Sequence, residues 1–401
     1  MERNILAIFA DSILSTKTKD SNVILEINPI GEQILDSKFY RLTRLPTYLD
    51  PATTAITVIN SVRAGKQQGA AVYAKVIQPL FAFLGVTHRY IESTSPNSIS
   101  DFASRLDIAQ TLVILSGDTS IHEVVNSLQI TSDQDLVLAP IPTGSGNALM
   151  TSCGVESVSR ALVTLLHGSL HPLNPFYVSF PEGTQEVVPP TESDPESKTI
   201  ALAPGGSSSP GSFHRIYALV VVSWAIHAAL VGDSDSPEYR KLGNDRFLIA
   251  AKANLARNDA WHGTITYSTT DGRKRVIEGP HSYVLTTSIS SLEPGFVIAP
   301  TAEPLSGKIE LVRLPYLNGD EIMRLLTLAY QQGKHVNEPE VLYDELADCK
   351  VDINEPSERL RRWCVDGRIF IVPDRTSVEL HKGEPIVRGW NIQIVTPQPL
   401  E

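Results

Sequence analysis

Residues 112–128 read Leu-Val-Ile-Leu-Ser-Gly-Asp-Thr-Ser-Ile-His-Glu-Val-Val-Asn-Ser-Leu. The apolar run at 112–115 predicts a buried β-strand, and the small polar residues at 116–120 predict a turn. A helix is expected to follow, because apolar residues recur at i, i+3, i+4 and i+7 from Ile121. This stretch therefore predicts one strand–turn–helix unit of a parallel α/β sheet.

A second copy of the same arrangement comes directly afterwards. The apolar residues 136–138 lead into the turn Pro142-Thr143-Gly144-Ser145-Gly146-Asn147 and then into Ala148. Turns of this kind direct backbone N–H groups and a helix dipole at one place, and glycine lets a ligand approach the backbone. Phosphate is the ligand that fits, whereas a tight turn without a ligand is the alternative.

Both turns carry a family resemblance. Ser116-Gly117-Asp118-x-x-x-His122-Glu123, followed by Pro142-Thr143-Gly144-Ser145-Gly146-Asn147-Ala148-Leu149, resembles the nucleotide-binding core of the diacylglycerol kinase and sphingosine kinase family. The Gly-Ser-Gly-Asn form is most similar to the sphingosine kinase branch. The resemblance implies a nucleotide domain followed by a β-rich domain that binds lipid.

Composition predicts a soluble globular protein. The 401 residues are 42% hydrophobic and 20% charged, which predicts ample core and two domains. A net charge of −11 argues against a nucleic-acid partner. Cys153, Cys349 and Cys364 lie far apart without zinc-binding spacing, so a reducing compartment is expected. The family resemblance implies a cytoplasmic protein that visits membrane surfaces transiently.

No transmembrane segment or secretory signal is predicted. The residues after Met1 include an acidic side chain and only a short apolar run. The longest apolar run, Ile216–Val231, is too short to span a membrane and predicts a long buried strand.

The predicted fold class is α/β plus β, with three regions along the chain. Residues 1–54 predict a small β-type appendage, and residues 55–170 predict a parallel-sheet α/β nucleotide-binding domain. Residues 171–401 predict a β-sandwich, because short β-type runs dominate there, and the family resemblance implies that this domain binds lipid. Pro, Ser and Gly predict a flexible segment near residues 181–212.

The strand at 55–59 ends where the family has a loop over the ATP phosphates. Asn60 is kept, Ser61 stands where proline is usual, and Gly65-Lys66 follow. Thr94 falls where the family has a threonine that contacts the nucleotide. An ordinary turn with a solvated lysine, and an ordinary loop threonine, are the alternatives.

Tyr239-Arg240-Lys241-Leu242-Gly243-x-x-Arg246 resembles a sphingosine kinase segment whose two arginines reach the ATP phosphates. Arg240 and Arg246 are phosphate clamps by this resemblance, and two solvated or ion-paired arginines are the alternative. Counting back from Tyr239 places the family's lipid-binding acid at Asp233, whereas counting forward from Trp224 does not reach an acid. The lipid headgroup that this position would recognise is therefore either a sphingoid amine or a neutral lipid hydroxyl.

Two residues depart from the family pattern. Arg368 stands where glutamate follows the Asp-Gly pair of Asp366, so either a phosphate-side cation has replaced a carboxylate or the site has lost its chemistry. Asp366 itself is a nucleotide ligand by resemblance or simply a hairpin aspartate. Thr119 replaces a glycine and would be strained if its backbone were left-handed.

The function expected from the resemblance is an ATP-dependent lipid kinase that phosphorylates a primary hydroxyl of a long-chain lipid at a membrane surface. Asp118 would accept the hydroxyl proton, and Mg²⁺ would bridge the phosphates. The proposed nucleotide-binding residues are Asn60, Thr94, Ser116, Gly117, Glu123, Thr143, Gly144, Ser145, Gly146, Asn147, Arg240, Arg246 and Asp366. Glu123 and Asn60 also fit a helix-start acid and a turn former. Three other functions remain open: a catalytically impaired nucleotide- or lipid-binding member, an NAD kinase-like enzyme and a protein-interaction module.

Overall fold

The chain divides into two compact units. The computed structural model describes residues 3–8, 12–19, 22–29, 42–62, 64–188, 198–202, 214–235, 239 and 246–398. Unit 1 contains residues 1–173 and 385–401, and unit 2 contains residues 174–384. Most of the segment near 181–212 that was predicted to be flexible lies outside the described residues.

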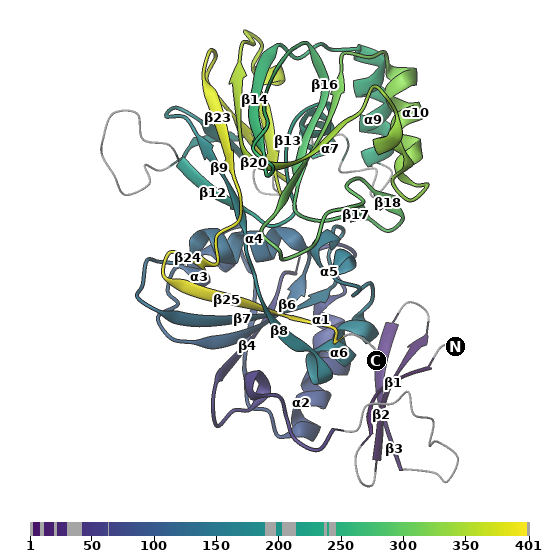
Figure 1. Ribbon diagram of the computed structural model, residues 1–401. Coiled ribbons are helices and arrows are strands. Elements are labelled where there is room, and N and C mark those ends of the chain that lie inside the picture. Colours follow the sequence, from purple (N-terminus) through teal and green to yellow (C-terminus); the bar gives the residue numbers. More distant parts are fainter. Residues whose placement is uncertain are drawn as a thin grey trace. The chain divides into compact units, whose positions relative to one another are not determined.

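Unit 1 is organised on a mainly parallel sheet with the order β24–β25–β7–β6–β4–β5, and β8 pairs with β25 (Figure 1). The strands are β4 (Ala55–Asn60), β5 (Arg89–Glu92), β6 (Gln110–Ser116), β7 (Gln134–Pro142), β8 (Ser169–Pro172), β24 (Ile386–Val387) and β25 (Trp390–Thr396). All seven residues of β6 are buried. Burial on both faces explains why this strand reads as an uninterrupted apolar run.

Short helices connect the strands of unit 1. They are η1 (Thr47–Leu49), α1 (Gly69–Val72), η2 (Tyr73–Ile77), α2 (Gln78–Leu84), α3 (Ser98–Ala103), α4 (Asp118–Ser127), α5 (Ala148–Ser152) and α6 (Val158–His167). Val72, Val76 and Leu80 point into the core, as their four-residue spacing predicts. Ser157 caps α6, because its side chain accepts a hydrogen bond from the amide of Arg160.

Strand β25 belongs to unit 1, although the sequence places it in the second domain. It runs parallel to β7, with Trp390 opposite Gln134 and Ile394 opposite Leu138. The indole of Trp390 is fully buried and donates a hydrogen bond to the carbonyl of Gln129 at 2.9 Å. Pairing between segments this far apart leaves no local signal in the sequence, and adjacency alone favoured the other assignment.

The N-terminal residues of unit 1 form an antiparallel sheet of β1 (Arg3–Ile8), β2 (Ser12–Lys19) and β3 (Asn22–Pro29). This sheet packs on α6. The hydroxyls of Thr16 and Ser159 lie 2.8 Å apart, and the imidazole of His167 lies 2.9 Å from the carbonyl oxygen of Leu6. Both contacts connect the N-terminal sheet to α6.

Unit 2 is one large curled sheet with the order β11–β10–β22–β21–β13–β16–β19–β20–β23–β9–β12, and β14 joins β20 to β15 (Figure 1). Its strands are β9 (Phe176–Phe180), β10 (Gln185–Val188), β11 (Lys198–Ala201), β12 (His214–Ala218), β13 (Val221–Ala225), β14 (Gly263–Thr269), β15 (Lys274–Glu278), β16 (His281–Thr287), β19 (Ile309–Pro315), β20 (Leu342–Ile353), β21 (Arg362–Val365), β22 (Arg368–Ile371) and β23 (Ser377–His381). A separate ribbon pairs β17 (Ser291–Glu293) with β18 (Phe296–Val297). The predicted α/β domain followed by a β-rich domain is confirmed, and the predicted sandwich is built from one continuous curled sheet.

Within the described residues, three α-helices accompany this sheet, α7 (Ile226–Ser234), α9 (Arg246–Arg257) and α10 (Gly319–Ala329), together with the 3-10 helices η4 (Lys334–Asn337) and η5 (Glu358–Arg361). The apolar run at 216–231 is not one long strand, because it contains the end of β12, all of β13 and the start of α7. The chain changes direction at Ala225, which has φ +68°. Strand and helix are both buried here, so composition alone did not distinguish them.

No helix within the described part of the chain is long and apolar enough to cross a membrane.

Candidate active site

Three turns meet at the carboxyl edge of the sheet in unit 1. They follow β4, β6 and β7, which are neighbours in the sheet. The register places Asn60 opposite Leu115 and Ser116 opposite Pro142, so the three strands end at nearly the same level. Ligands of open parallel sheets bind at this edge.

Glycines let the three backbones touch. A Cβ atom on Gly144 would lie 2.5 Å from the Cα and nitrogen of Gly117, and one on Gly117 would clash with the carbonyl oxygen of Gly146. Gly65, at φ +51°, comes equally close to the turn after β7: its Cβ would lie 2.5 Å from the carbonyl oxygen of Thr143. The three turns therefore form one interlocked body of backbone, whose glycines cannot be replaced without movement.

Backbone hydrogen bonds fix the same contact. The amide of Asp118 donates to the carbonyl of Gly146 at 3.1 Å, and the amide of Thr143 donates to the carbonyl of Ser116 at 3.1 Å. Ser145 and Gly146 remain exposed. The turn after β7 is thus anchored at its base and open at its tip.

The Asp118 carboxylate lies at the centre of this body, half-buried, in the first turn of α4. Its Oδ2 accepts a hydrogen bond from the amide of Ala148 at 2.6 Å, and its Oδ1 accepts one from the amide of Leu149 at 3.2 Å. These amides begin α5, so Asp118 caps a helix that follows a different strand. Burial, together with the nearby Asp118 charge, raises the pKa of the Cys153 thiol to about 12 and keeps that thiol protonated.

Asn60 is the last residue of β4, at the same edge of the sheet. Its Nδ2 donates to the Tyr90 hydroxyl at 3.1 Å and to Glu92 Oε1 at 3.3 Å. Its side chain is fully buried against Gly69, where a Cβ atom would clash with Asn60 Oδ1. Within the described residues, Asn60 therefore acts on the ends of β4 and β5 rather than on the turn at 143–147.

The other predicted nucleotide-binding residues of unit 1 surround the turns. Ser116 is buried with its hydroxyl 2.6 Å from that of Ser120, and Asn147 Nδ2 donates to the carbonyl of Gly144 at 2.9 Å. Thr94 is exposed in the loop after β5, and Glu123 is half-buried on α4. Thr143 Oγ1 is buried and has no hydrogen-bond partner among the described residues.

Thr119 does not have the left-handed backbone that the departure from glycine raised as a concern. It is the second residue of α4 and is exposed. It is absent from the non-glycine residues with positive φ. The strain considered for this position therefore does not arise, because the turn is already helical here.

Asp366 sits in the hairpin between β21 and β22, with φ +47°. Only 5% exposed, its carboxylate accepts hydrogen bonds from the amides of Leu219, Val220 and Val221 at 2.8–2.9 Å. These three amides connect β12 to β13. The side chain closes a turn of unit 2's own sheet.

Arg368 pairs with a buried acid that the sequence did not suggest. Its Nε donates to Glu186 Oε1 at 2.6 Å, and its Nη2 contacts the same oxygen. Strand β10, which carries Glu186, lies beside β22 in the sheet. The cation at this position is thus neutralised within unit 2.

Asp233, the predicted lipid-binding acid, is surrounded by arginines. Its Oδ1 accepts from Arg362 at 2.9 Å and its Oδ2 from Arg257 at 2.8 Å, while Arg359 lies 3.7 Å away. Asn254 adds a hydrogen bond at 3.1 Å. Burial opposes ionisation of Asp233, but these donors outweigh it and hold the pKa of the carboxyl below its usual value.

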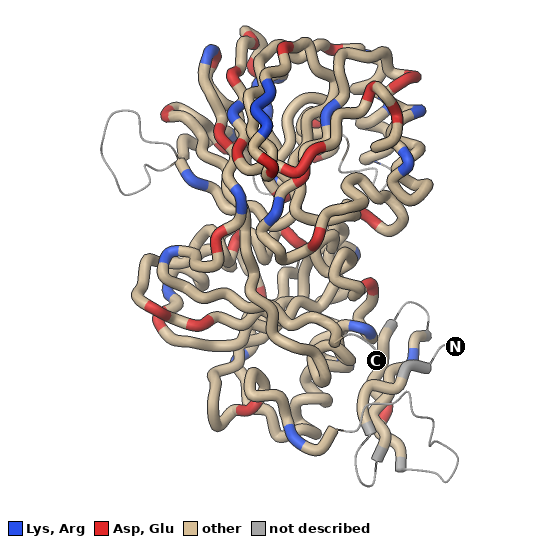
Figure 2. The backbone as a smooth tube through the Cα atoms, in the orientation of Figure 1, with Lys and Arg blue, Asp and Glu red and all other residues tan. Residues whose placement is uncertain are grey.

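Of the two predicted phosphate clamps, Arg240 lies outside the described residues. Arg246 begins α9, where it pairs with Asp235 at 3.1 Å and lies over the Phe247 ring at 4.7 Å. Figure 2 shows acidic and basic residues interspersed along unit 2. Ion pairs such as Arg246–Asp235 contribute to this mixed distribution of charge.

The hydrogen-bond and ion-pair partners of the predicted acids were not predicted from the sequence. Arg359, Arg361 and Arg362 stand within four residues of one another, and that basic run could have marked an acid-binding cluster. Glu186 had no such signal, because it meets Arg368 through the pairing of β10 with β22.

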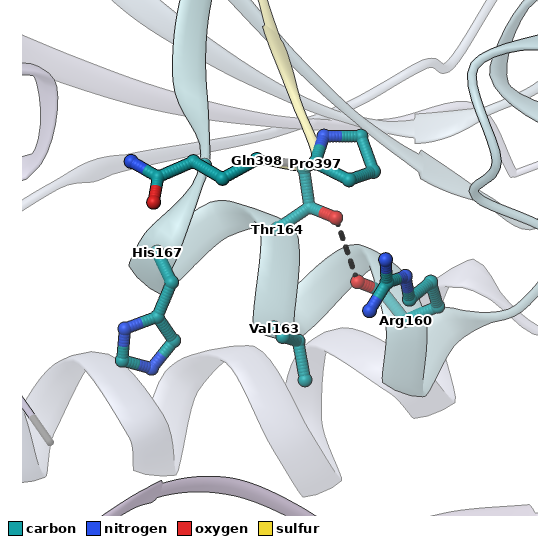
Figure 3. A pocket seen from close by; sticks show the side chains of 7 residues that line it. Arg160, Val163, Thr164, His167, Pro397 and Gln398 are labelled. Carbon is teal, nitrogen blue, oxygen red and sulfur yellow. Dashed lines mark hydrogen bonds between the residues drawn. The ribbon is translucent and has the colours of Figure 1, made fainter. Parts of the chain in front are cut away.

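A small hollow between α6 and residues 397–398 lies apart from these turns (Figure 3). Arg160, Val163, Thr164 and His167 line it, and the Thr164 hydroxyl donates to the carbonyl of Arg160 at 2.9 Å. It contains none of the predicted site residues, so the edge of the sheet remains the candidate site.

The described residues contain no group of three or more histidine, cysteine, aspartate or glutamate side chains that could hold a metal ion. A Mg²⁺ ion at this site would need phosphate oxygens of a bound nucleotide as further ligands, which is the usual arrangement in phosphoryl transfer.

Comparison with protein families identifies residues 55–178 as a match to the diacylglycerol kinase catalytic domain. The match begins at β4 and covers all three turns.

Curated relatives point to the same group. Sphingosine kinase 1 of Mus musculus is 24% identical over 238 residues, which are 55% of this chain and 54% of that protein. Sphingosine kinase B of Dictyostelium discoideum is 28% identical over 141 residues, 34% of this chain and 18% of that protein. The chain therefore spans about half the length, or less, of these relatives.

A solved structure supports the fold of both units. A diacylglycerol kinase from Bacillus anthracis str. Sterne superposes with a TM-score of 0.51, covering 86% of this chain and 97% of that one at 14% identity.

Proposed function

We propose that this chain, whose residues 55–178 match the diacylglycerol kinase catalytic domain, is a lipid kinase that transfers the γ-phosphate of ATP to a primary hydroxyl of a long-chain lipid. The observation that carries the proposal is the interlocked body of three turns with the Asp118 carboxylate fixed at its centre. The acceptor would be a sphingoid base or a diacylglycerol, met at a membrane surface.

The turns after β6 and β7 would hold the phosphates. Glycine at 144 and 146 leaves the backbone unobstructed by side chains, so phosphate oxygens can approach amide groups closely. Ser145 and Gly146 are exposed at the tip, where a ligand has access. Thr143 Oγ1, buried and without a partner among the described residues, offers a further donor toward this turn.

Asp118 would orient the acceptor hydroxyl and take its proton. As the hydroxyl oxygen forms its bond to the γ-phosphorus, the bond from that phosphorus to the leaving ADP oxygen breaks, and the proton passes to the carboxylate. Two backbone amides already fix the plane of the carboxylate, and a carboxylate has lone pairs for further hydrogen bonds. The group would therefore be preorganised for this role.

Arg240 and Arg246 would neutralise phosphate charge through bidentate guanidinium contacts. Arg246 would exchange its present partner, Asp235, for phosphate. A Mg²⁺ ion bound with the nucleotide would supply further charge neutralisation on the phosphate oxygens.

We propose structural roles for two other predicted residues. Asp366 is enclosed by three backbone amides. Asp233 could read a lipid amine only by leaving its guanidinium partners.

The test supplies the full chain with γ-labelled ATP and vesicles that contain sphingosine, diacylglycerol or ceramide, followed by separation of the lipids. A labelled lipid identifies the acceptor and supports the proposal. ATP binding without labelled lipid would favour a catalytically impaired member, and labelled NAD in a parallel reaction would favour an NAD kinase-like enzyme. Failure to bind any nucleotide would favour an interaction module.

A further inference from the structure

Glu92 is an exposed acid at the carboxyl edge of unit 1 that none of the roles above uses. It is the last residue of β5. Its Oε1 accepts hydrogen bonds from the Tyr90 hydroxyl at 2.6 Å and from Asn60 Nδ2 at 3.3 Å. Both bonds go to one oxygen, and Oε2 accepts none from the rest of the described chain.

Rigid neighbours hold this carboxylate in place. The Tyr90 ring stacks on Tyr73 with centroids 3.6 Å apart and planes inclined by 7°. The Tyr73 hydroxyl lies 3.0 Å from His88 Nε2, and Asn60 is fully buried. Burial and the bond to Glu92 raise the pKa of the Tyr90 hydroxyl, so that hydroxyl remains a donor at all physiological pH values.

Direct contacts connect the end of β5 to the phosphate turns. The amide of Ser93 donates to the carbonyl of Asn60 at 2.9 Å, and the hydroxyl of Ser93 accepts from the amide of Val62 at 3.1 Å. The loop after Val62 reaches Gly65, which touches the backbone of Thr143 and Gly144. Glu92 thus lies next to residues that contact the end of β4, and Gly65 in the turn after β4 contacts the turn at 143–147.

This placement resembles a general arrangement for nucleotides on parallel sheets. When phosphates sit on the turn after one strand, an acid at the carboxyl end of another strand accepts hydrogen bonds from the ribose hydroxyls. Here Glu92 ends β5, which pairs with β4 and not with β6 or β7, and the turn after β4 contacts the turn after β7. A carboxylate suits this task because it only accepts hydrogen bonds and both ribose hydroxyls can donate. Glu92 meets these requirements, because its Oε2 accepts no hydrogen bond from the described residues and can accept one from a ribose hydroxyl.

We infer that Glu92 is the ribose-recognition residue of this site, accepting hydrogen bonds from the ribose hydroxyls of the nucleotide whose phosphates occupy the turns at 116–118 and 143–147. Tyr90 and Asn60 are positioning residues, because they act through Glu92. This inference rests on the proposed function, since it needs a nucleotide at the same edge.

The test measures equilibrium binding of ATP, 2′-deoxy-ATP, 3′-deoxy-ATP and inosine triphosphate to the full chain by calorimetry. The unaltered chain is expected to bind ATP about tenfold or more tightly than at least one deoxy nucleotide, the scale of a hydrogen bond to a charged group. Inosine triphosphate, which keeps the ribose but lacks the adenine amino group, is expected to bind like ATP.

Three variants test whether the preference for ribose depends on Glu92. Glu92→Leu should bind ATP as weakly as it binds the deoxy nucleotides, because the ribose acceptor is gone. Tyr90→Phe keeps the stacked ring and should lose only part of the preference for ribose. Asp101→Asn, an exposed acid on α3 of the same unit, is the control and should keep the full preference.

The outcomes separate the two proposals. Equal affinities of the unaltered chain for ATP and both deoxy nucleotides would overturn the role of Glu92 alone. A preference that survives Glu92→Leu, or a loss confined to inosine triphosphate, would also overturn it. No ATP binding by the unaltered chain would overturn the proposed function, and this inference with it.

Discussion

Two aspartates in this molecule bind backbone in almost the same way. Asp118 accepts hydrogen bonds from two successive amides at the start of α5, and Asp366 accepts them from three successive amides between β12 and β13. Their surroundings differ. Asp118 is half-buried beside exposed glycine and serine, whereas Asp366 is 5% exposed within a sheet.

This difference distinguishes a candidate site residue from a residue that only stabilises a turn. Hydrogen bonds to amides orient a carboxylate in either case, but only an accessible carboxylate can meet a substrate hydroxyl. A sequence motif with Asp-Gly or Gly-Asp does not report which of the two conditions holds. We therefore propose that accessibility, and not the pattern of amide donors, distinguishes a catalytic role for Asp118 from a structural role for Asp366.

The strongest test of this comparison is Asp118→Asn. Turnover with the preferred lipid should fall by at least about a hundredfold, because the amide cannot take up the hydroxyl proton. Circular dichroism and thermal melting should show that the fold is kept. Turnover equal to that of the unaltered chain would remove Asp118 from catalysis.

Gly146→Asp tests whether the open tip of the neighbouring turn receives phosphate. A Cβ atom at this position would lie 3.8 Å from Asp118 Oδ2, so it fits sterically but brings a second negative charge to the site. ATP affinity should fall at least about tenfold, with little change in melting temperature. Gly146→Ala adds the carbon without the charge and should cost much less affinity. Undiminished ATP binding by Gly146→Asp would show that phosphate lies elsewhere.

Asp366→Asn is the matched change on the other side of the comparison. Asparagine tolerates the positive φ of this residue, so the loss comes from the weakened amide contacts. The free energy of unfolding should drop by about 2 kcal/mol, whereas ATP affinity of the folded chain should stay the same. Chemical denaturation and calorimetry measure the two quantities. A fall in ATP affinity with unchanged stability would return Asp366 to the nucleotide site.

Arg368→Glu carries the smallest expected effect. It places a second acid against Glu186 and should lower the free energy of unfolding by about 1 kcal/mol, without raising lipid phosphorylation. Reversing both charges, Glu186→Arg with Arg368→Glu, should recover most of that loss. A large gain in lipid phosphorylation, alone or combined with Thr119→Gly, would instead identify a kinase that has decayed at these two positions.

Features encoded by neighbouring residues could be predicted from the sequence. The strand–turn–helix units around Ser116–Asp118 and Thr143–Asn147 depend on local apolar spacing and glycine, and the structure has both. The helical start at Asp118 also removes the strain that Thr119 would carry in a left-handed turn. What the local pattern did not contain was the direct contact between Gly117 and Gly144.

Features created by distant pairing could not be predicted in the same way. Asp366 was predicted to be a nucleotide ligand, with a hairpin aspartate as the alternative, and its three amide partners lie 145–147 positions earlier in the chain. Asp233 was chosen by counting along the motif, and counting carries no information about Arg257 or Arg362. The charge of an isolated residue is visible in a sequence, whereas the charge that remains after pairing is a property of the fold.

Strand β25 pairs with β7 only after the chain has passed through unit 2, and this order has a consequence for biosynthesis. On the ribosome, β7 emerges long before β25, and the whole of unit 2 is made in between. Until residues 390–396 arrive, β7 has its neighbour β6 on one side only, and its other edge is open to pairing with foreign strands. Protection of that edge during synthesis therefore depends on β25, which completes the pairing of β7 only after unit 2 has been made.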